Sequence, residues 1–229
     1  MPSARNVLVL AGTLAAGIAI CRVAGEGELE GSSSQCPPAD FETVENFDLE
    51  SFISKRWWAQ QQMEVSYLSK DVNRCVYAEY KTQSGSFWGY DVAVHNHAEG
   101  VEEPHKVKDS GSFICAKVVD AKRGKLEVAP CFLPSIFAGP YWVLDYSESE
   151  GYALVSGGAP KHSSNDGCKT GSGINNSGLW IFTRAQTRDQ ALVDKVRGIA
   201  KAKGFDVSVL NNIDQTACTE PPSEMSVTV

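Results

Sequence analysis

Eight short runs of β-branched and aromatic residues, separated by turn residues, constrain the fold of this sequence more than any other feature. Because such runs at close spacing are typical of all-β sandwiches and barrels, we expect an all-β domain of one of these two kinds. A length of 229 residues supports one such domain. The expected strands are 56–63, 74–82, 86–95, 112–119, 125–132, 141–146, 152–156 and 179–184.

One segment near the C-terminus has helical periodicity instead. Thr187 and Gln190 fit a capping box at its start, and Gly204 fits the position just after a helix. The residues expected on one side of this helix are Leu192, Val196, Ile199 and Lys203. We therefore predict one α-helix packed on the outside of the barrel.

The cysteines indicate an oxidising compartment. Cys21 lies in the N-terminal segment, and the other six are Cys36, Cys75, Cys115, Cys131, Cys168 and Cys218. An even set in an exported chain predicts disulfides, although the count alone leaves their connectivity open. No pair has the C-x-x-C spacing of a zinc or redox site.

One disulfide follows from a hairpin. Lys122-Arg123-Gly124 reads as a three-residue loop that ends in Gly. Folding the chain about Arg123 places Cys115 opposite Cys131, at the separation a disulfide requires. We therefore predict a Cys115–Cys131 bond.

The N-terminal region reads as a targeting signal. Residues 7–20 form an apolar, uncharged run preceded by Arg5, with the length of a signal-peptide core. We expect a signal or targeting peptide over 1–24, a flexible leader over 25–35, one domain over 36–218 and a disordered tail over 219–229. The alternatives for the first segment are an uncleaved anchor or a buried helix. Cleavage would leave no stable membrane span and would deliver the chain outside the cell or into an organelle lumen.

The net charge of the chain limits the classes of partner that it can bind. The formal net charge is -7, and no cluster of Lys and Arg reverses it locally. This balance argues against nucleic acid or an anionic membrane as the main partner.

Several motifs follow one another along nearly the whole chain from Cys36 to about Cys218. They include Glu45-Asn46-Phe47-Asp48-Leu49, Arg56-Trp57-Trp58, Arg74-Cys75-Val76-Tyr77, Pro140-Tyr141-Trp142-Val143 and Leu179-Trp180-Ile181-Phe182-Thr183-Arg184. This ordered series resembles the lipocalin family, and most closely its branch with apolipoprotein D, insecticyanin and bilin-binding protein. The lipocalin domain of violaxanthin de-epoxidase is similar to a smaller part of it.

The resemblance implies an eight-stranded antiparallel up-and-down β-barrel with a closed floor, and two disulfides. Trp57 would close one end of the barrel, with Arg184 lying over its ring. Lys55 stands where the family usually has Gly, so the closed end could differ locally. The implied disulfides are Cys36–Cys168 and Cys75–Cys218, which together with the hairpin pair use all six cysteines.

The resemblance also implies a small hydrophobic ligand, such as a fatty acid, sterol, retinoid, carotenoid or tetrapyrrole, and no obligatory cofactor. An eight-stranded barrel is just wide enough to hold one such molecule. Aromatic residues along the strands and loops are the candidates for its lining. They are Trp58, Tyr80, Trp88, Tyr90, Phe113, Phe132, Phe137 and Trp142.

Catalytic and metal sites have little support in the sequence. No Gly-x-Ser-x-Gly, His-Glu-x-x-His or phosphate-loop motif is present. His95, His97 and His105 lack a convincing acidic partner, so we expect no metal. Arg74 replaces the catalytic Asp of violaxanthin de-epoxidase, and the lipocalin prostaglandin synthases need a free thiol. We therefore expect a carrier and no enzyme, with a de-epoxidase-like activity as the weaker alternative.

Two further expectations concern the surface. Asn175-Asn176-Ser177 is an N-glycosylation sequon at Asn175, meaningful only for a chain that passes through the endoplasmic reticulum. A different function class also stays open, namely a lumenal subunit docked on a pigment–protein assembly. Copurification with a large complex would favour that class, and a bound chromophore would favour the carrier.

Overall fold

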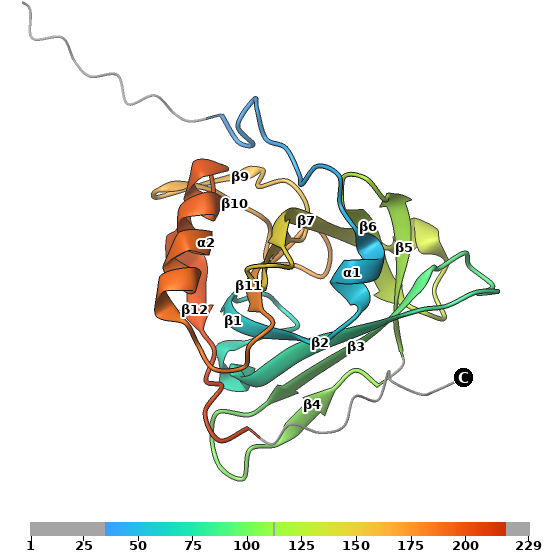
Figure 1. Cartoon of the computed structure of the whole chain (residues 1–229), viewed down its shortest axis with the longest axis horizontal. Helices are drawn as coiled ribbons and strands as arrows, with labels where there is room; N and C mark the ends of the chain where they lie inside the picture. The colour runs from blue at the N-terminus through green and yellow to red at the C-terminus, as the bar shows by residue number, and fades with distance from the viewer. Residues whose placement is uncertain (1–34, 112, 219–229) are drawn as a thin grey trace, which may run out of the picture. The chain divides into compact units, whose positions relative to one another are not determined.

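The computed structural model describes residues 35–111 and 113–218, and eight of its strands close into an antiparallel barrel (Figure 1). Each strand pairs with the next along the barrel, and β11 pairs with β1 to close it. This confirms the predicted fold. The strands are β1 (Trp57–Met63), β2 (Arg74–Thr82), β3 (Val92–Glu99), β5 (Ile114–Asp120), β6 (Lys125–Pro130), β7 (Gly139–Ser147), β8 (Tyr152–Ser156) and β11 (Leu179–Thr183).

Several short strands and helices lie outside the eight barrel strands. β4 pairs with β3, β12 pairs with β1, and β9 with β10 forms a separate two-stranded sheet. Their bounds are β4 (Val107–Asp109), β9 (His162–Ser164), β10 (Gly167–Lys169) and β12 (Leu210–Asn212). The short helices are α1 (Leu49–Ile53) and the 3-10 turns η1 (Lys70–Val72), η2 (Ser135–Phe137) and η3 (Val207–Val209).

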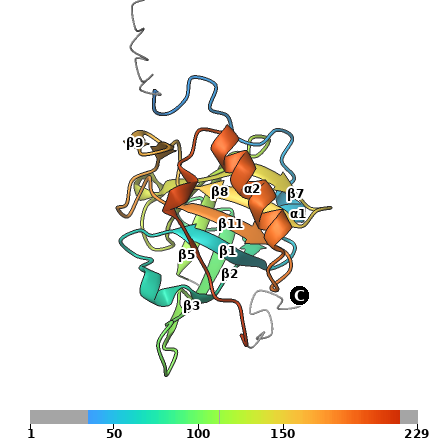
Figure 2. The same ribbon diagram turned by 90° about the vertical axis from the view of Figure 1, so that its left-hand side faces the viewer.

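The C-terminal helix α2 (Gln190–Ala202) lies on the outside of the barrel over β8 and β11 (Figure 2). The expected capping box is wrong, because Asp189 is the N-cap and its carboxylate accepts hydrogen bonds from the backbone N–H groups of residues 191 and 192. The C-terminal end follows the prediction. Gly204 has a φ of +84°, and the two backbone bonds of a Schellman motif run from residues 204 and 205 to the carbonyls of residues 201 and 200.

The buried face of α2 is shifted by one residue from the predicted one. Val193, Val196 and Ala200 are fully buried, whereas Leu192 and Ile199 border them and are partly exposed. These side chains pack against outward-facing residues of the barrel strands and form an outer core. Among the described residues, no helix combines the length and apolarity needed to cross a membrane.

The segment before β3 differs from the prediction. β3 begins at Val92 and not at residue 86, because residues 83–91 form a turn. Gly85 and Gly89 adopt positive φ angles there, and the backbone N–H of Tyr90 donates to Ser86 Oγ. This turn folds over the outer face of β5 and β6, where Tyr90 packs on Cys115 and Ala129.

The hairpin between β5 and β6 has a different register from the one expected. Cys115 stands opposite Ala129, because Asp120 pairs with Lys125 across the turn and β5 carries one extra residue between Val118 and Asp120. The disulfide nevertheless joins Cys115 to Cys131, which lies just beyond the end of β6. Gly124 at the end of the loop has the left-handed φ that was expected, +59°.

Two long-range disulfides hold the ends of the domain to the barrel. Cys36 is joined to Cys168 on β10, and Cys75 on β2 is joined to Cys218. All three pairs are those predicted. Residues 1–34 and 219–229 lie outside the described part of the chain, so the signal peptide, nearly all of the leader and the tail stay predictions.

Candidate functional site

One end of the barrel interior is closed by a stack of three layers. Phe52 of α1 lies against the ring of Trp57, with their centroids 5.4 Å apart. The guanidinium of Arg184 lies on the same indole, 3.5 Å from the ring centroid. Trp57 Nε1 donates to the carbonyl oxygen of Phe52 at 2.8 Å, which fixes the short helix on the floor of the barrel.

Arg184 also ties this floor to its surroundings. Its Nη2 donates to the carbonyl oxygens of Ser51 and Phe52 at 2.9 and 3.0 Å, and to Glu148 Oε2 at 2.8 Å. These carbonyls lie at the C-terminal end of α1, where the Ser51 carbonyl also accepts from Ser54 and the Phe52 carbonyl from Trp57. Lys55 is not among the residues with a positive φ, so this turn does not need the Gly that the family usually has.

The inward faces of the strands form an apolar wall. Alternation along each strand sends one residue in two to the interior, and five of the buried inward residues are alanines. These are Ala59, Ala78, Ala98, Ala116 and Ala153. Small side chains at these positions leave more room along the axis than Val or Leu would.

Partly exposed residues border the interior at the end opposite Trp57. Ile114, Val128 and Tyr141 pack against the interior cluster and yet remain partly exposed. Asn96, which has the same strand parity as the inward-facing Val94, is exposed. We call this region the open half of the interior. It is bordered by the segment between β1 and β2, whose Leu68 and Val72 pack against the same cluster.

Two tyrosines meet across the open half. The hydroxyl oxygens of Tyr80 on β2 and Tyr141 on β7 are 2.6 Å apart. Burial raises the pKa of both phenols, so each stays a neutral group that can donate or accept a hydrogen bond at physiological pH. The ring of Tyr141 also stacks on Trp180, with their centroids 6.5 Å apart.

A buried amide completes the polar part of the site. Gln62 stands opposite Trp180 in the pairing of β1 with β11, so both side chains face the interior. Gln62 Nε2 donates to Asn73 Oδ1 at 2.7 Å, whereas Gln62 Oε1 is buried without a hydrogen-bond partner. A buried acceptor without a donor is costly, so this oxygen favours a donor brought by a bound molecule.

Three of the eight predicted lining residues face outward instead. Trp58 packs edge-on against Tyr77, Tyr90 covers the Cys115–Cys131 disulfide, and Trp142 stacks on Phe41. This corrects the expectation that these three residues line the interior. The reason is strand parity: each of the two tryptophans follows a residue that points inward, Trp57 or Tyr141.

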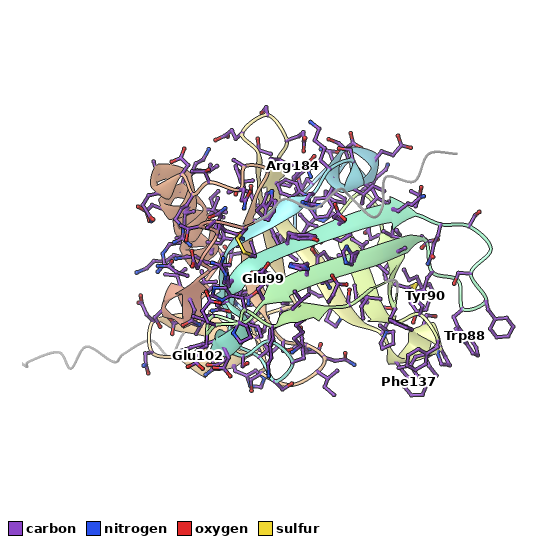
Figure 3. All side chains as sticks on the ribbon, turned by 90° about the horizontal axis from the view of Figure 1, so that it is seen from below. Trp88, Tyr90, Glu99, Glu102, Phe137 and Arg184 are labelled. Atoms are coloured by element: carbon purple, nitrogen blue, oxygen red, sulfur yellow. A yellow bond between two sulfur atoms is a disulfide. The ribbon has the colours of Figure 1, made fainter. Side chains whose placement is uncertain are left out.

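Of the remaining five candidates, only Tyr80 lies in the interior cluster. The other four are exposed at the surface, namely Trp88, Phe113, Phe132 and Phe137. Figure 3 shows Trp88 and Phe137 at the same end of the molecule, away from Arg184. Gln62 and Tyr141, which are not among the predicted residues, belong to the candidate site; alternation along β7 places Tyr141 on the same face as the inward Val143.

The histidines of β3 take part in a polar cluster on the outer face. His95 Nε2 lies 2.8 Å from Asp109 Oδ1, and His97 Nδ1 lies 3.1 Å from Asp109 Oδ2. His95 Nδ1 also faces Glu79, which pairs with Arg56 at 2.9 Å. The acidic partner that the sequence did not reveal therefore comes from β4. Within residues 35–111 and 113–218, no group of three or more His, Cys, Asp or Glu side chains is placed to hold a metal ion.

Comparison with known proteins gives structural matches only. No protein-family model matches the sequence, and no curated protein matches it. Insecticyanin from the tobacco hornworm Manduca sexta is 17% identical with a TM-score of 0.49, covering 79% of this chain and 86% of its own.

Two other structures give similar values. Lobster apocrustacyanin A1 is 15% identical with a TM-score of 0.48, covering 74% of this chain and 81% of its own. A major allergen from cockroaches is 12% identical with a TM-score of 0.48, covering 79% and 95%. Each identity is below 25% and each TM-score is below 0.5, so we take neither family nor ligand from these matches.

Proposed function

We propose that this protein is a lipocalin that binds a small hydrophobic molecule in the open half of its interior and carries or sequesters it. The observation that carries this proposal is the apolar inward wall in which Ile114, Val128 and Tyr141 stay partly exposed. A closed barrel with an accessible apolar interior suits a lipid, sterol, retinoid, carotenoid or tetrapyrrole. The ordered motifs around Trp57 and Arg184 support the family.

The polar groups of the site favour a ligand with one hydrogen-bonding end. A hydroxyl group of the ligand could donate to Gln62 Oε1, while its apolar body lies along Trp180 and the inward alanines. The Tyr80–Tyr141 pair offers a second place for a hydroxyl or carbonyl group. Few polar groups in an apolar wall fix the orientation of a ligand without making its binding strong by themselves.

A carrier also fits the chemistry of the cysteines. Every cysteine among the described residues forms a disulfide, so a free-thiol mechanism finds no group there. Disulfides are typical of chains that work outside the cell or in an organelle lumen, and we propose one of these compartments.

The ligand can be identified directly. Protein purified from its native source is extracted with organic solvent, and the extract is analysed by mass spectrometry and absorption. We expect one dominant hydrophobic compound in a fixed ratio to protein. Recovery of an empty protein that also fails to bind a broad panel of apolar compounds would contradict the proposal.

A pair of variants locates the site. Val128→Trp fills the open half from β6, whereas Glu127→Trp adds the same side chain on the outer face of the same strand. We expect the first variant to lose binding of the extracted compound and the second to keep it. Equal binding by both variants would place the ligand elsewhere.

A further inference from the structure

Exposed apolar side chains gather at the end of the barrel where the open half lies. We call this set the rim; it consists of Phe87, Trp88, Phe113, Phe132, Ile136, Phe137 and Ile174. Hydrogen bonds between the segments that carry it hold it together. Trp88 Nε1 donates to the carbonyl oxygen of Phe132, and Asn175 Nδ2 donates to that of Phe137. Figure 3 shows Trp88 and Phe137 at the same end of the molecule.

The four segments of sequence that carry the rim contain no charged residue. Its segments 82–90, 110–116, 128–144 and 170–183 contain no Asp, Glu, Lys or Arg, although the chain has 49 such residues, counting 21 basic and 28 acidic ones. A patch of exposed large apolar residues without charges is unusual at a protein surface and marks an interaction site. Burying the side chains of these segments in an apolar medium desolvates no ion of theirs.

The shape of the rim favours a deformable partner over a folded protein. Phe87, Ile136 and Ile174 project singly from three separate segments and are each at least 80% exposed. A folded partner would need a matched pocket for each tip, whereas a lipid surface admits them without one. Aromatic side chains such as Phe87 and Trp88 suit the boundary between headgroups and acyl chains.

The net charge of the whole chain indicates which class of lipid headgroup the rim would meet. A net charge of -7 disfavours an anionic surface, while an uncharged rim needs no electrostatic attraction. We propose that the rim inserts shallowly into the surface of a membrane of zwitterionic lipids. This inference does not require that the barrel hold a ligand. If it does, docking brings the open half to the membrane surface.

The first test measures flotation of the full chain with phosphatidylcholine vesicles. The variant Phe87→Ser/Ile136→Ser/Ile174→Ser removes the three tips, and Val101→Ser/Val107→Ser/Val119→Ser changes three exposed valines outside the rim. We expect the tip variant to partition at least about tenfold more weakly, and the valine variant to match the wild type. Addition of phosphatidylserine should not strengthen binding. Equal flotation of both variants, together with no quenching through Trp88 in the second test, would overturn the proposal.

The second test reports on the rim alone, because the apolar run at residues 7–20 could hold the chain on vesicles by itself. Phosphatidylcholine brominated in its acyl chains quenches tryptophans that reach it. We expect quenching of the wild type, and loss of most of it in Trp88→Phe. The proposal would be overturned if the wild type showed no quenching, or if Trp88→Phe were quenched as strongly as the wild type. It would also be overturned if the wild type did not bind vesicles but formed a dimer that the tip variant abolishes.

Binding of an apolar fluorescent probe without vesicles separates the two proposals. The tip variant should bind the probe like the wild type, which also shows that it folds. If the protein binds the probe but not the membrane, only the rim proposal is contradicted. If it binds the membrane but not the probe, only the proposal of a carrier is contradicted. Asn175 lies next to Ile174 on this surface, so a glycan at the sequon should abolish flotation; unglycosylated protein is therefore used throughout.

Discussion

The guanidinium of Arg184 lies 3.5 Å from the centroid of the Trp57 ring and holds the end of α1 through two carbonyl oxygens. One side chain therefore joins the last barrel strand, the first barrel strand and the helix that covers the floor. Because Arg184 also pairs with Glu148 at 2.8 Å, its loss would leave this partly buried carboxylate with only the exposed Lys55, at 3.8 Å, as a cation.

Arg184→Ala should destabilise the fold by about 3 kcal/mol, through the lost stacking on Trp57 and the loss of the closer cation of Glu148. Arg184→Lys should recover less than about half of that loss, since an ammonium cannot lie flat on the indole while donating to five acceptors. Urea unfolding measures both. The control is Lys55→Ala, an exposed partner of the same Glu148, which should change stability by less than about 0.5 kcal/mol. Similar values for Arg184→Ala and the control would contradict this role.

The stability of the domain should depend on the ionisation of Asp206. Burial would raise the pKa of this carboxyl, but hydrogen bonds from Ser164 and Ser208 lower it from 3.8 to about 2. A carboxyl with a lowered pKa stabilises the fold above its unfolded pKa, and this stability is lost as pH falls from about 4 to about 2. The contribution at neutral pH is about 2 kcal/mol.

Asp206→Asn should therefore flatten part of the acid limb in a plot of unfolding free energy against pH. It should not flatten all of it, because the pKa values of Asp109 and Asp214 are also lowered. Asp166→Asn changes an exposed aspartate near the same hairpin and should leave the curve as it is. An unaltered slope in Asp206→Asn would refute the assignment.

The disulfides should differ in their effect on stability according to the length of the loop that each closes. Cys115→Ser/Cys131→Ser opens a loop with a separation of 16 residues, a loss of about 3 kcal/mol in the chain-entropy model. Cys75→Ser/Cys218→Ser opens one of 143 residues, a loss of about 5 kcal/mol. Denaturant unfolding of the two variants compares them, and equal losses would argue against the entropic account.

The two interior tyrosines should be energetically coupled. In Tyr80→Phe or Tyr141→Phe the remaining phenol loses its partner at 2.6 Å. Each single variant is therefore destabilised by one buried hydroxyl without a partner, whereas the double variant has no such hydroxyl. A double-mutant cycle of unfolding free energies should give a coupling of about 1 kcal/mol. Additive effects would show that the hydroxyls do not depend on one another.

The barrel could be predicted from the sequence because its strands are short, alternate in polarity and are separated by turn residues. The bounds of β2 and β8 agree with the prediction at both ends. The register of β5 and β6 could not be predicted, since the shift between Val118 and Asp120 is a local irregularity with no distinct signature in the residues. The start of β3 was placed too early because Phe87 and Trp88 resemble strand residues but lie in a turn.

The candidate site was predicted less well, and strand parity explains why. The prediction assigns aromatic residues to the interior by residue type alone, whereas only one in two positions of a strand faces the interior. Trp142 is outward because α2 and Phe41 build a second, outer core on β7 and β8. Gln62 could not be assigned by counting from Trp57, because the shift between Ala59 and Gln61 changes the parity of β1.

The stack of α1, Trp57 and Arg184 closes one end of the barrel. A molecule bound in the open half would therefore enter and leave at the opposite end, which Leu68 and Val72 border. A change in residues 64–73 that obstructs this passage without touching the bound molecule would slow uptake and release by the same factor. Such a change would lengthen the residence time and leave the equilibrium affinity untouched.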